Sequence, residues 1–84
     1  RVGVIGLGAA GTAIARMLGA VSIHPVIGFD PGAEAIARLR ALGGEPARDI
    51  PELMARADLV VAVTGRAGRI PGESVRRGQG ILAL

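Results

Sequence analysis

Three glycines near the start of the chain, Gly6, Gly8 and Gly11, have the spacing G-x-G-x-x-G. The apolar residues 2–5 before them predict a buried strand, and residues 9–18 after them favour a helix. Glycines at such a turn let an anionic pyrophosphate approach the free N–H groups of the helix N-terminus, where the helix dipole also favours negative charge. In this context the pattern predicts a dinucleotide-binding loop.

Each glycine of the loop has an expected role. We expect Gly6 to make the tight turn out of the strand, Gly8 to leave room for the phosphates, and Gly11 to let the helix pack against the sheet. The alternative interpretation is a tight turn whose small residues serve packing alone. The candidate cofactor-binding residues of this loop are Gly6, Leu7, Gly8, Ala9, Ala10 and Gly11.

A carboxylate occupies the second position that such a site requires. Asp30 follows the apolar run 26–29, about 20 residues after Gly11, where an acid can accept both hydroxyls of an adenosine ribose. Its charge would repel a 2′-phosphate, and residues 31–33 bring no arginine, so NAD is favoured over NADP. Two alternatives stay open: Asp30 as a turn residue before Pro31-Gly32, and S-adenosylmethionine as the adenosine ligand. Pro31 joins Asp30 in the candidate site.

The loop after the apolar run 59–63 adds further candidates. In a doubly wound sheet this loop lies beside the first strand, at the switch point where ligands bind. We expect Thr64 to hydrogen-bond a ribose and Gly65 to permit close approach, with a plain connecting loop as the alternative. Arg66 or Arg69 can meet a phosphate or a substrate carboxylate, although such arginines are more often solvated surface charges. The candidates here are Val63, Thr64, Gly65 and Arg66.

Alternating apolar runs and helical patterns are expected to position these residues. The sequence predicts an α/β, Rossmann-like doubly wound parallel sheet in three layers, with strand order 3-2-1-4-5. No long helical pattern separates the last two strands, so we expect one sheet face there to pack against other segments or another subunit. The expected strands are 2–5, 26–29, a short edge strand at 46–48, 59–63 and 81–84, and the expected helices are 9–18, 33–42, one capped by Asp49, and 72–77.

Helical periodicity predicts which side of each helix is buried. On the first helix the predicted apolar stripe consists of Ala13, Ile14, Met17 and Leu18, and Gly19 is a plausible stop. On the third helix we expect Leu53, Met54 and Ala57 to be buried.

Composition excludes several classes of protein. The ten basic residues are all arginine, give a net charge of +3, and are scattered along a chain with one aromatic residue, which argues against nucleic-acid binding. No apolar run approaches the roughly 20 residues of a membrane span, so no membrane partner is expected. The lack of cysteine excludes thiolate metal sites and fits a cytoplasmic location. His24, the single histidine, is expected far from the glycine loop. The sequence shows no other convincing nucleophile, general base or metal cluster, so we assign no catalytic or metal-ligating residue to this chain.

The 84 residues are short for an independent domain. We expect residues 1–84 to be one NAD(P)-binding domain, an excerpt of a longer chain. A partner catalytic domain outside this segment would then hold the small-molecule substrate and supply the catalytic groups, and the parent is expected to be a homo-oligomer.

Residues 6–16, 57–65 and 81–84 resemble the NAD-binding domain of malic enzymes. The first loop of that family often reads G-A-G-A-A-G, and its fifth strand often ends in A-L-x-N-P. The double alanine Ala9-Ala10 and the closing Leu82-Ala83-Leu84 carry the resemblance here. It implies oxidative decarboxylation of malate to pyruvate with NAD(P) and Mg²⁺ or Mn²⁺. The family's Tyr and Lys catalysts and its metal carboxylates match nothing in this chain, so the divalent ion is expected outside the segment.

Other families are similar in the second half of the chain. Residues 64–71 and 75–78 are similar to the segment after the fourth strand in methylenetetrahydrofolate dehydrogenases. S-adenosylhomocysteine hydrolases and 2-hydroxyacid dehydrogenases have a similar arrangement there, a threonine or glycine loop followed by an x-x-G-x pattern that enters the fifth strand. The leading hypothesis is the cofactor domain of an NAD-dependent oxidoreductase, malic-enzyme-like. The rival of another class is a non-catalytic nucleotide-sensing module, such as the cytoplasmic ligand-binding domains of ion transport systems, because fold alone does not fix function.

Overall fold

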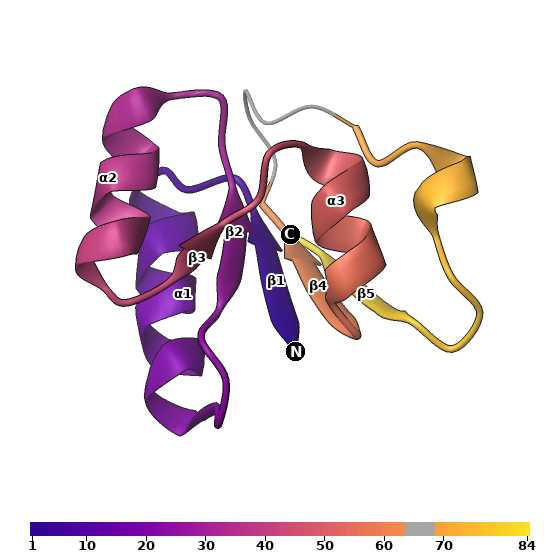
Figure 1. The fold of residues 1–84 in the computed structure, drawn as a ribbon, viewed down its shortest axis with the longest axis horizontal. Helices are drawn as coiled ribbons and strands as arrows, with labels where there is room; N and C mark the ends of the chain where they lie inside the picture. Colours follow the sequence, from indigo (N-terminus) through magenta and orange to yellow (C-terminus); the bar gives the residue numbers. More distant parts are fainter. Residues whose placement is uncertain (64–68) are drawn as a thin grey trace.

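The computed structural model describes residues 1–63 and 69–84 of the chain (Figure 1). In these residues five strands form one sheet in the order β3-β2-β1-β4-β5, and every neighbouring pair is parallel. The predicted Rossmann-like α/β architecture and its strand order are confirmed. The strands are β1 (Val2–Ile5), β2 (Ile27–Phe29), β3 (Glu45–Pro46), β4 (Leu59–Ala62) and β5 (Gly80–Ala83).

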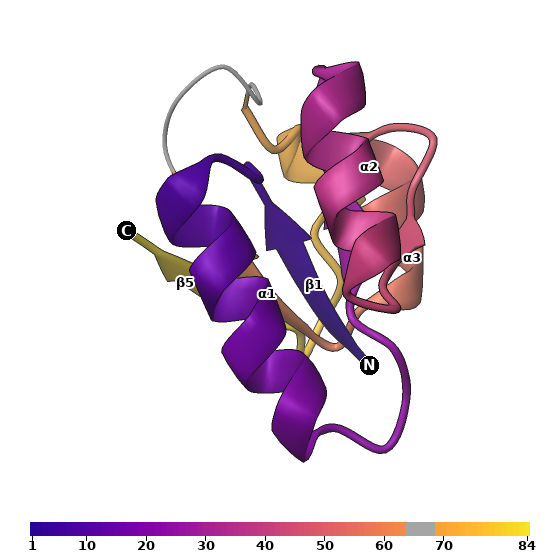
Figure 2. The same cartoon turned by 90° about the vertical axis from the view of Figure 1, so that its left-hand side faces the viewer.

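The helices cover the sheet from both sides. The described segments contain α1 (Ala9–Val21), α2 (Ala33–Ala41), α3 (Ile50–Arg56) and a single 3-10 turn, η1 (Gly72–Ser74). Figures 1 and 2 show α1 and α2 side by side on one face of the sheet and α3 on the other, which gives the three predicted layers. No described helix is long and apolar enough to cross a membrane.

Two apolar clusters, one on each face, form the core. Successive residues of a strand point to opposite faces, so Val4 of β1 packs toward α1 and α2 whereas Ile5 packs toward α3. Burial on both faces is typical of the central strands of a parallel sheet. The first cluster contains Val4, Leu7, Ala15, Val26, Ala35, Leu39 and Val61, and the second contains Ile5, Ile27, Ala47, Ile50, Leu53, Met54, Ala57 and Val60.

The N-terminus of α3 is capped as the sequence predicts. The Asp49 carboxylate accepts a hydrogen bond from the Glu52 N–H at 2.8 Å, and Glu52 accepts one from the Arg48 N–H at 2.7 Å. Pro51 occupies the first turn, where its missing N–H has no helical partner. This cap fixes where α3 begins, and Leu53, Met54 and Ala57 are fully buried as expected.

The predicted apolar stripe of the first helix is wrong in two positions. Ala13 is exposed and Met17 is 64% exposed, whereas Ile14 and Leu18 pack against the core. The buried Gly11 and Ala15 share the face of Ile14 and Leu18 at helical spacing, so the small residues rather than Met17 face the sheet. The helix also continues to Val21 instead of stopping at Gly19, and Gly19 does not have the positive φ that is common where a glycine ends a helix.

Several strand and helix boundaries also differ from expectation. The edge strand β3 is shorter and begins one residue earlier, and the predicted helix at 72–77 is only the turn η1. In β4 the first residue, Leu59, is 42% exposed. Ile81, Leu82 and Leu84 at the β5 edge are exposed within this chain. The uncovered apolar surface expected near the last two strands is therefore present, while what covers it stays a prediction.

Two glycines of α1 make the packing of this helix testable by the same change, glycine to alanine, at each position. A Cβ at Gly11 would lie 1.7 Å from the Gly6 carbonyl oxygen, whereas a Cβ at Gly19 would meet, among the described residues, only Val26, at 3.7 Å. We expect Gly11→Ala to lower the free energy of unfolding by about 3 kcal/mol or more, because backbone must move apart. Gly19→Ala should raise it by about 0.5–1 kcal/mol through helix propensity. Urea unfolding of the full-length protein measures both, and equal effects would contradict the close approach at Gly11.

Candidate functional site

The loop between β1 and α1 begins with a glycine that no other residue can replace without strain. Gly6 has a φ of +93°, and a Cβ there would lie 2.4 Å from the Val63 carbonyl oxygen. Its N–H donates to the Phe29 carbonyl oxygen at 2.9 Å. The tight turn expected at Gly6 is thus present, and it lies directly beside the end of β4.

The N-terminus of α1 is open at Gly8 within the part of the chain that the structure describes. Gly8 is the N-cap residue, with no side-chain cap and no acidic residue in the first turn, and a Cβ there would meet no described residue within 4 Å. Thr12 makes the first backbone hydrogen bond of the helix, from its N–H to the Gly8 carbonyl oxygen. The N–H groups that precede it form the positive end of the helix dipole. This end of α1, which includes Ala9 and Ala10, is suited to an anion.

Asp30 joins the end of β2 to the glycine loop. It is only 8% exposed, and its carboxylate accepts hydrogen bonds from the Leu7 N–H and the Gly32 N–H, each at 2.8 Å. The bond to Gly32 is the turn role that the sequence left open as an alternative. Each carboxylate oxygen accepts more than one hydrogen bond, so the turn role and the ribose role are compatible.

Leu7 is held by side chains on both of its backbone groups. Besides the bond from its N–H to Asp30, its carbonyl oxygen accepts hydrogen bonds from the Thr12 hydroxyl and the Arg38 guanidinium, each at 2.9 Å. Sequence reasoning identified neither Thr12 nor Arg38. Arg38 lies 31 residues from Leu7 on another helix, so no local pattern indicates the contact. For Thr12 the signal is its position directly after Gly11.

An open hollow of about 610 Å³ adjoins Asp30 at the carboxyl ends of β2 and β3. Its volume lies in the range of small-molecule sites. Arg40 and Arg48 also line this hollow. Arginines from other parts of the chain therefore lie near Asp30, although residues 31–33 contain none. Arg48 is paired with Asp49 at 3.6 Å and with Glu52 at 3.7 Å, which compensates its charge. The lining residues are Phe29, Asp30, Pro31, Ile36, Arg40, Pro46, Ala47, Arg48 and Glu52.

The remaining candidates divide into those that the structure places and those that it does not. Val63 donates its N–H to the Ile5 carbonyl oxygen at 2.8 Å and adjoins Gly6, and its role toward a cofactor stays a prediction. Pro31 is exposed next to Asp30. The candidates Thr64, Gly65 and Arg66 lie outside the described residues.

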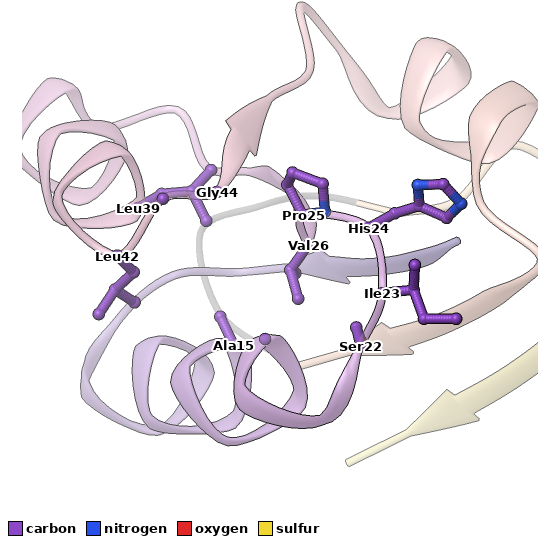
Figure 3. A pocket seen from close by; sticks show the side chains of 11 residues that line it. Ala15, Ser22, Ile23, His24, Pro25, Val26, Leu39, Leu42 and Gly44 are labelled. Atoms are coloured by element: carbon purple, nitrogen blue, oxygen red, sulfur yellow. The ribbon is translucent and has the colours of Figure 1, made fainter.

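His24 lies at the opposite end of the sheet, as expected. Figure 3 shows it on the link between α1 and β2, beside a hollow of about 230 Å³ that Ile23, Val26 and Leu42 help to line. No group of three or more His, Cys, Asp or Glu side chains suited to a metal ion occurs within residues 1–63 and 69–84. The glycine loop and Asp30 therefore form the candidate site.

Comparison with known proteins agrees with this geometry. Residues 1–67 match the family of the D-isomer specific 2-hydroxyacid dehydrogenase, NAD binding domain. Over all 84 residues the chain is 49% identical to NAD-dependent malic enzyme 1 of Bacillus subtilis (strain 168). The match covers the whole of this chain and 19% of that relative, so the chain spans about a fifth of the relative's length.

Removal of the Asp30 carboxylate should destabilise the fold. Asp30→Ala leaves the buried Leu7 N–H and the Gly32 N–H without this acceptor, so we expect the free energy of unfolding to fall by about 2 kcal/mol or more. Asp30→Asn keeps one acceptor oxygen and should lose less. Chemical denaturation of the full-length variants measures the difference. Unchanged stability in Asp30→Ala would show that these two hydrogen bonds contribute nothing.

Proposed function

The chain belongs to the NAD-binding domain family of D-isomer specific 2-hydroxyacid dehydrogenases, and on that premise we propose that its glycine loop holds NAD for an oxidoreductase acting on malate. The observation that carries this proposal is the uncapped N-terminus of α1, which faces open space at Gly8 next to the Asp30 carboxylate. An anionic dinucleotide needs N–H donors without bulk for its pyrophosphate and an acceptor for its ribose. Here the Asp30 carboxylate accepts a hydrogen bond from Leu7, the residue directly before Gly8, so the N–H donors and the acceptor lie close together.

Each part of the site has a binding role in this proposal. The first-turn N–H groups of α1 would hold the pyrophosphate, and the bare Cα of Gly8 would let it approach. Asp30 would accept the adenosine ribose hydroxyls, with the adenosine over the hollow that Pro31 and Ile36 help to line. When bound, NAD supplies the hydride acceptor. The residues of this chain bind and orient it, and we assign them no step of proton or hydride transfer.

Malate is proposed as the substrate because two comparisons point to related chemistry. The relative at 49% identity is named an NAD-dependent malic enzyme, and the matching family is named for 2-hydroxyacids, a class that includes malate. The family match also supports a second candidate, the oxidation of a different 2-hydroxy acid. The described residues hold no metal-ligand cluster, so in a malic-enzyme-like parent the Mg²⁺ or Mn²⁺ would be bound by other parts of the protein.

Partners and location complete the proposal. The substrate would be held by a further domain, and the exposed apolar residues of β4 and β5 would be covered by that domain or by a second subunit of a homo-oligomer. No nucleic-acid or membrane partner is proposed. The proposed compartment is the cytoplasm, whose reducing conditions suit a chain without cysteine.

Cofactor binding can be tested by titrating the full-length protein with NADH and NADPH while nicotinamide fluorescence is recorded. We expect NADH to bind about tenfold or more tightly than NADPH, because the Asp30 charge repels a 2′-phosphate. Gly8→Ala should weaken NADH binding with little loss of stability, because its methyl group would meet no described residue but would lie where the pyrophosphate is proposed to approach. Gly72→Ala, whose methyl group would likewise meet no described residue within 4 Å, is the matched control. Equal NADH affinity in Gly8→Ala and the unaltered protein would contradict the proposed loop.

The substrate is tested by NADH production. We expect the full-length protein to reduce NAD with malate in the presence of Mn²⁺ and to release pyruvate. Turnover of another 2-hydroxy acid but not of malate would remove malate and retain the oxidoreductase class. NADH binding without turnover of any 2-hydroxy acid would favour a nucleotide-sensing module instead.

A further inference from the structure

We propose that Arg38 and Thr12 are positioning residues of the cofactor site: together they hold the Leu7 carbonyl and thereby orient the N–H groups that meet the pyrophosphate. This inference rests on the proposed function, since it assigns a role toward the bound dinucleotide. Neither side chain needs to touch the ligand to act in this way.

The contacts come from three different elements and converge on one residue. Thr12 lies in the first turns of α1, and Arg38 lies on α2. Both donate to the same carbonyl oxygen, each at 2.9 Å, while Asp30 accepts from the N–H of the same residue at 2.8 Å. The Leu7 side chain is itself 1% exposed and packs in the core. Leu7 is therefore held on its N–H, its carbonyl and its side chain.

The geometry of the peptide bond transmits this constraint to Gly8. None of the peptide bonds within residues 1–63 and 69–84 is cis, so the Leu7 carbonyl and the Gly8 N–H lie in one plane and point in opposite directions. Holding the carbonyl toward Thr12 and Arg38 directs the Gly8 N–H away from them. It also fixes where the chain enters α1, and so the direction of the next free N–H groups.

A glycine at this position makes such a clamp necessary. Gly8 is exposed and has no Cβ, and apart from its chain neighbours no atom of residues 1–63 and 69–84 lies within 4 Å of where one would be, so no side chain of these residues packs against it there. Glycine also has the greatest backbone freedom of any residue. Donors that are ordered before the ligand arrives bind an anion more tightly, because the ligand does not have to order them. Arg38 and Thr12 supply that order from outside the loop.

The test compares ligands with and without a pyrophosphate on the full-length protein. NADH affinity is measured by nicotinamide fluorescence, and ADP-ribose and adenosine affinities by calorimetry or by competition with NADH. The variants are Arg38→Met, which removes the guanidinium, and Thr12→Val, which removes only the hydroxyl and changes no charge. Arg16→Met is the matched control, because Arg16 is an exposed arginine on α1 and its loss removes the same charge. Thermal unfolding of every variant is recorded.

We expect both Arg38→Met and Thr12→Val to weaken ADP-ribose and NADH, the first by about tenfold, and to leave adenosine affinity within about twofold. Arg38→Lys should restore part of the loss, because an ammonium group can donate to the same carbonyl. Equal loss for adenosine and ADP-ribose would show a merely structural role and overturn the proposal. Loss in Arg38→Met with none in Thr12→Val would show that charge acts rather than the carbonyl contact, which also overturns it.

The same data separate this inference from the proposed function. If the unaltered protein binds neither NADH nor ADP-ribose, the proposed function fails and this inference fails with it. If it binds both and no variant changes either affinity, only the positioning role is overturned.

Discussion

The close approach of α1 to the turn after β1 is the constraint on which the rest of the structure depends. A Cβ at Gly11 would lie 1.7 Å from the Gly6 carbonyl oxygen, so the helix can start where it does only because position 11 is a glycine. This contact brings the N-terminus of α1 to the carboxyl edge of the sheet. It also places Ile14, Ala15 and Leu18 on the core, and it leaves the first-turn N–H groups facing outward.

Asp30 contributes to the fold at the position where the ribose acceptor is proposed. Its carboxylate is buried at the end of β2, where the N–H groups of Leu7 and Gly32 stabilise its charge. Those bonds tie the second strand to the glycine loop. The carboxylate proposed as the ribose acceptor is therefore held in place by the same hydrogen bonds that tie β2 to the loop.

The site is formed by loops and helix ends, whereas the sheet serves to place them. The core residues of β1, β2 and β4 pack on both faces, so the carboxyl ends of these strands cannot shift relative to one another without opening the core. The edge strand β5 differs, because Ile81 and Leu82 are exposed within this chain. The strands that pack on both faces are thus the ones that carry the glycine loop and Asp30.

The sequence by itself determined the local features: the strand, turn and helix around the glycines, the acid after β2, the Asp49 cap and the order of the strands. Neighbouring residues encode these features through periodicity, turn chemistry and the handedness of crossovers. Only the tertiary structure decided which side of α1 faces the sheet, that Arg38 reaches Leu7, and that Arg40 and Arg48 line the hollow beside Asp30. These contacts join residues far apart in the chain. The sequence contains several arginines and several apolar helix positions of the same type, and only the packed structure determines which of them makes each contact.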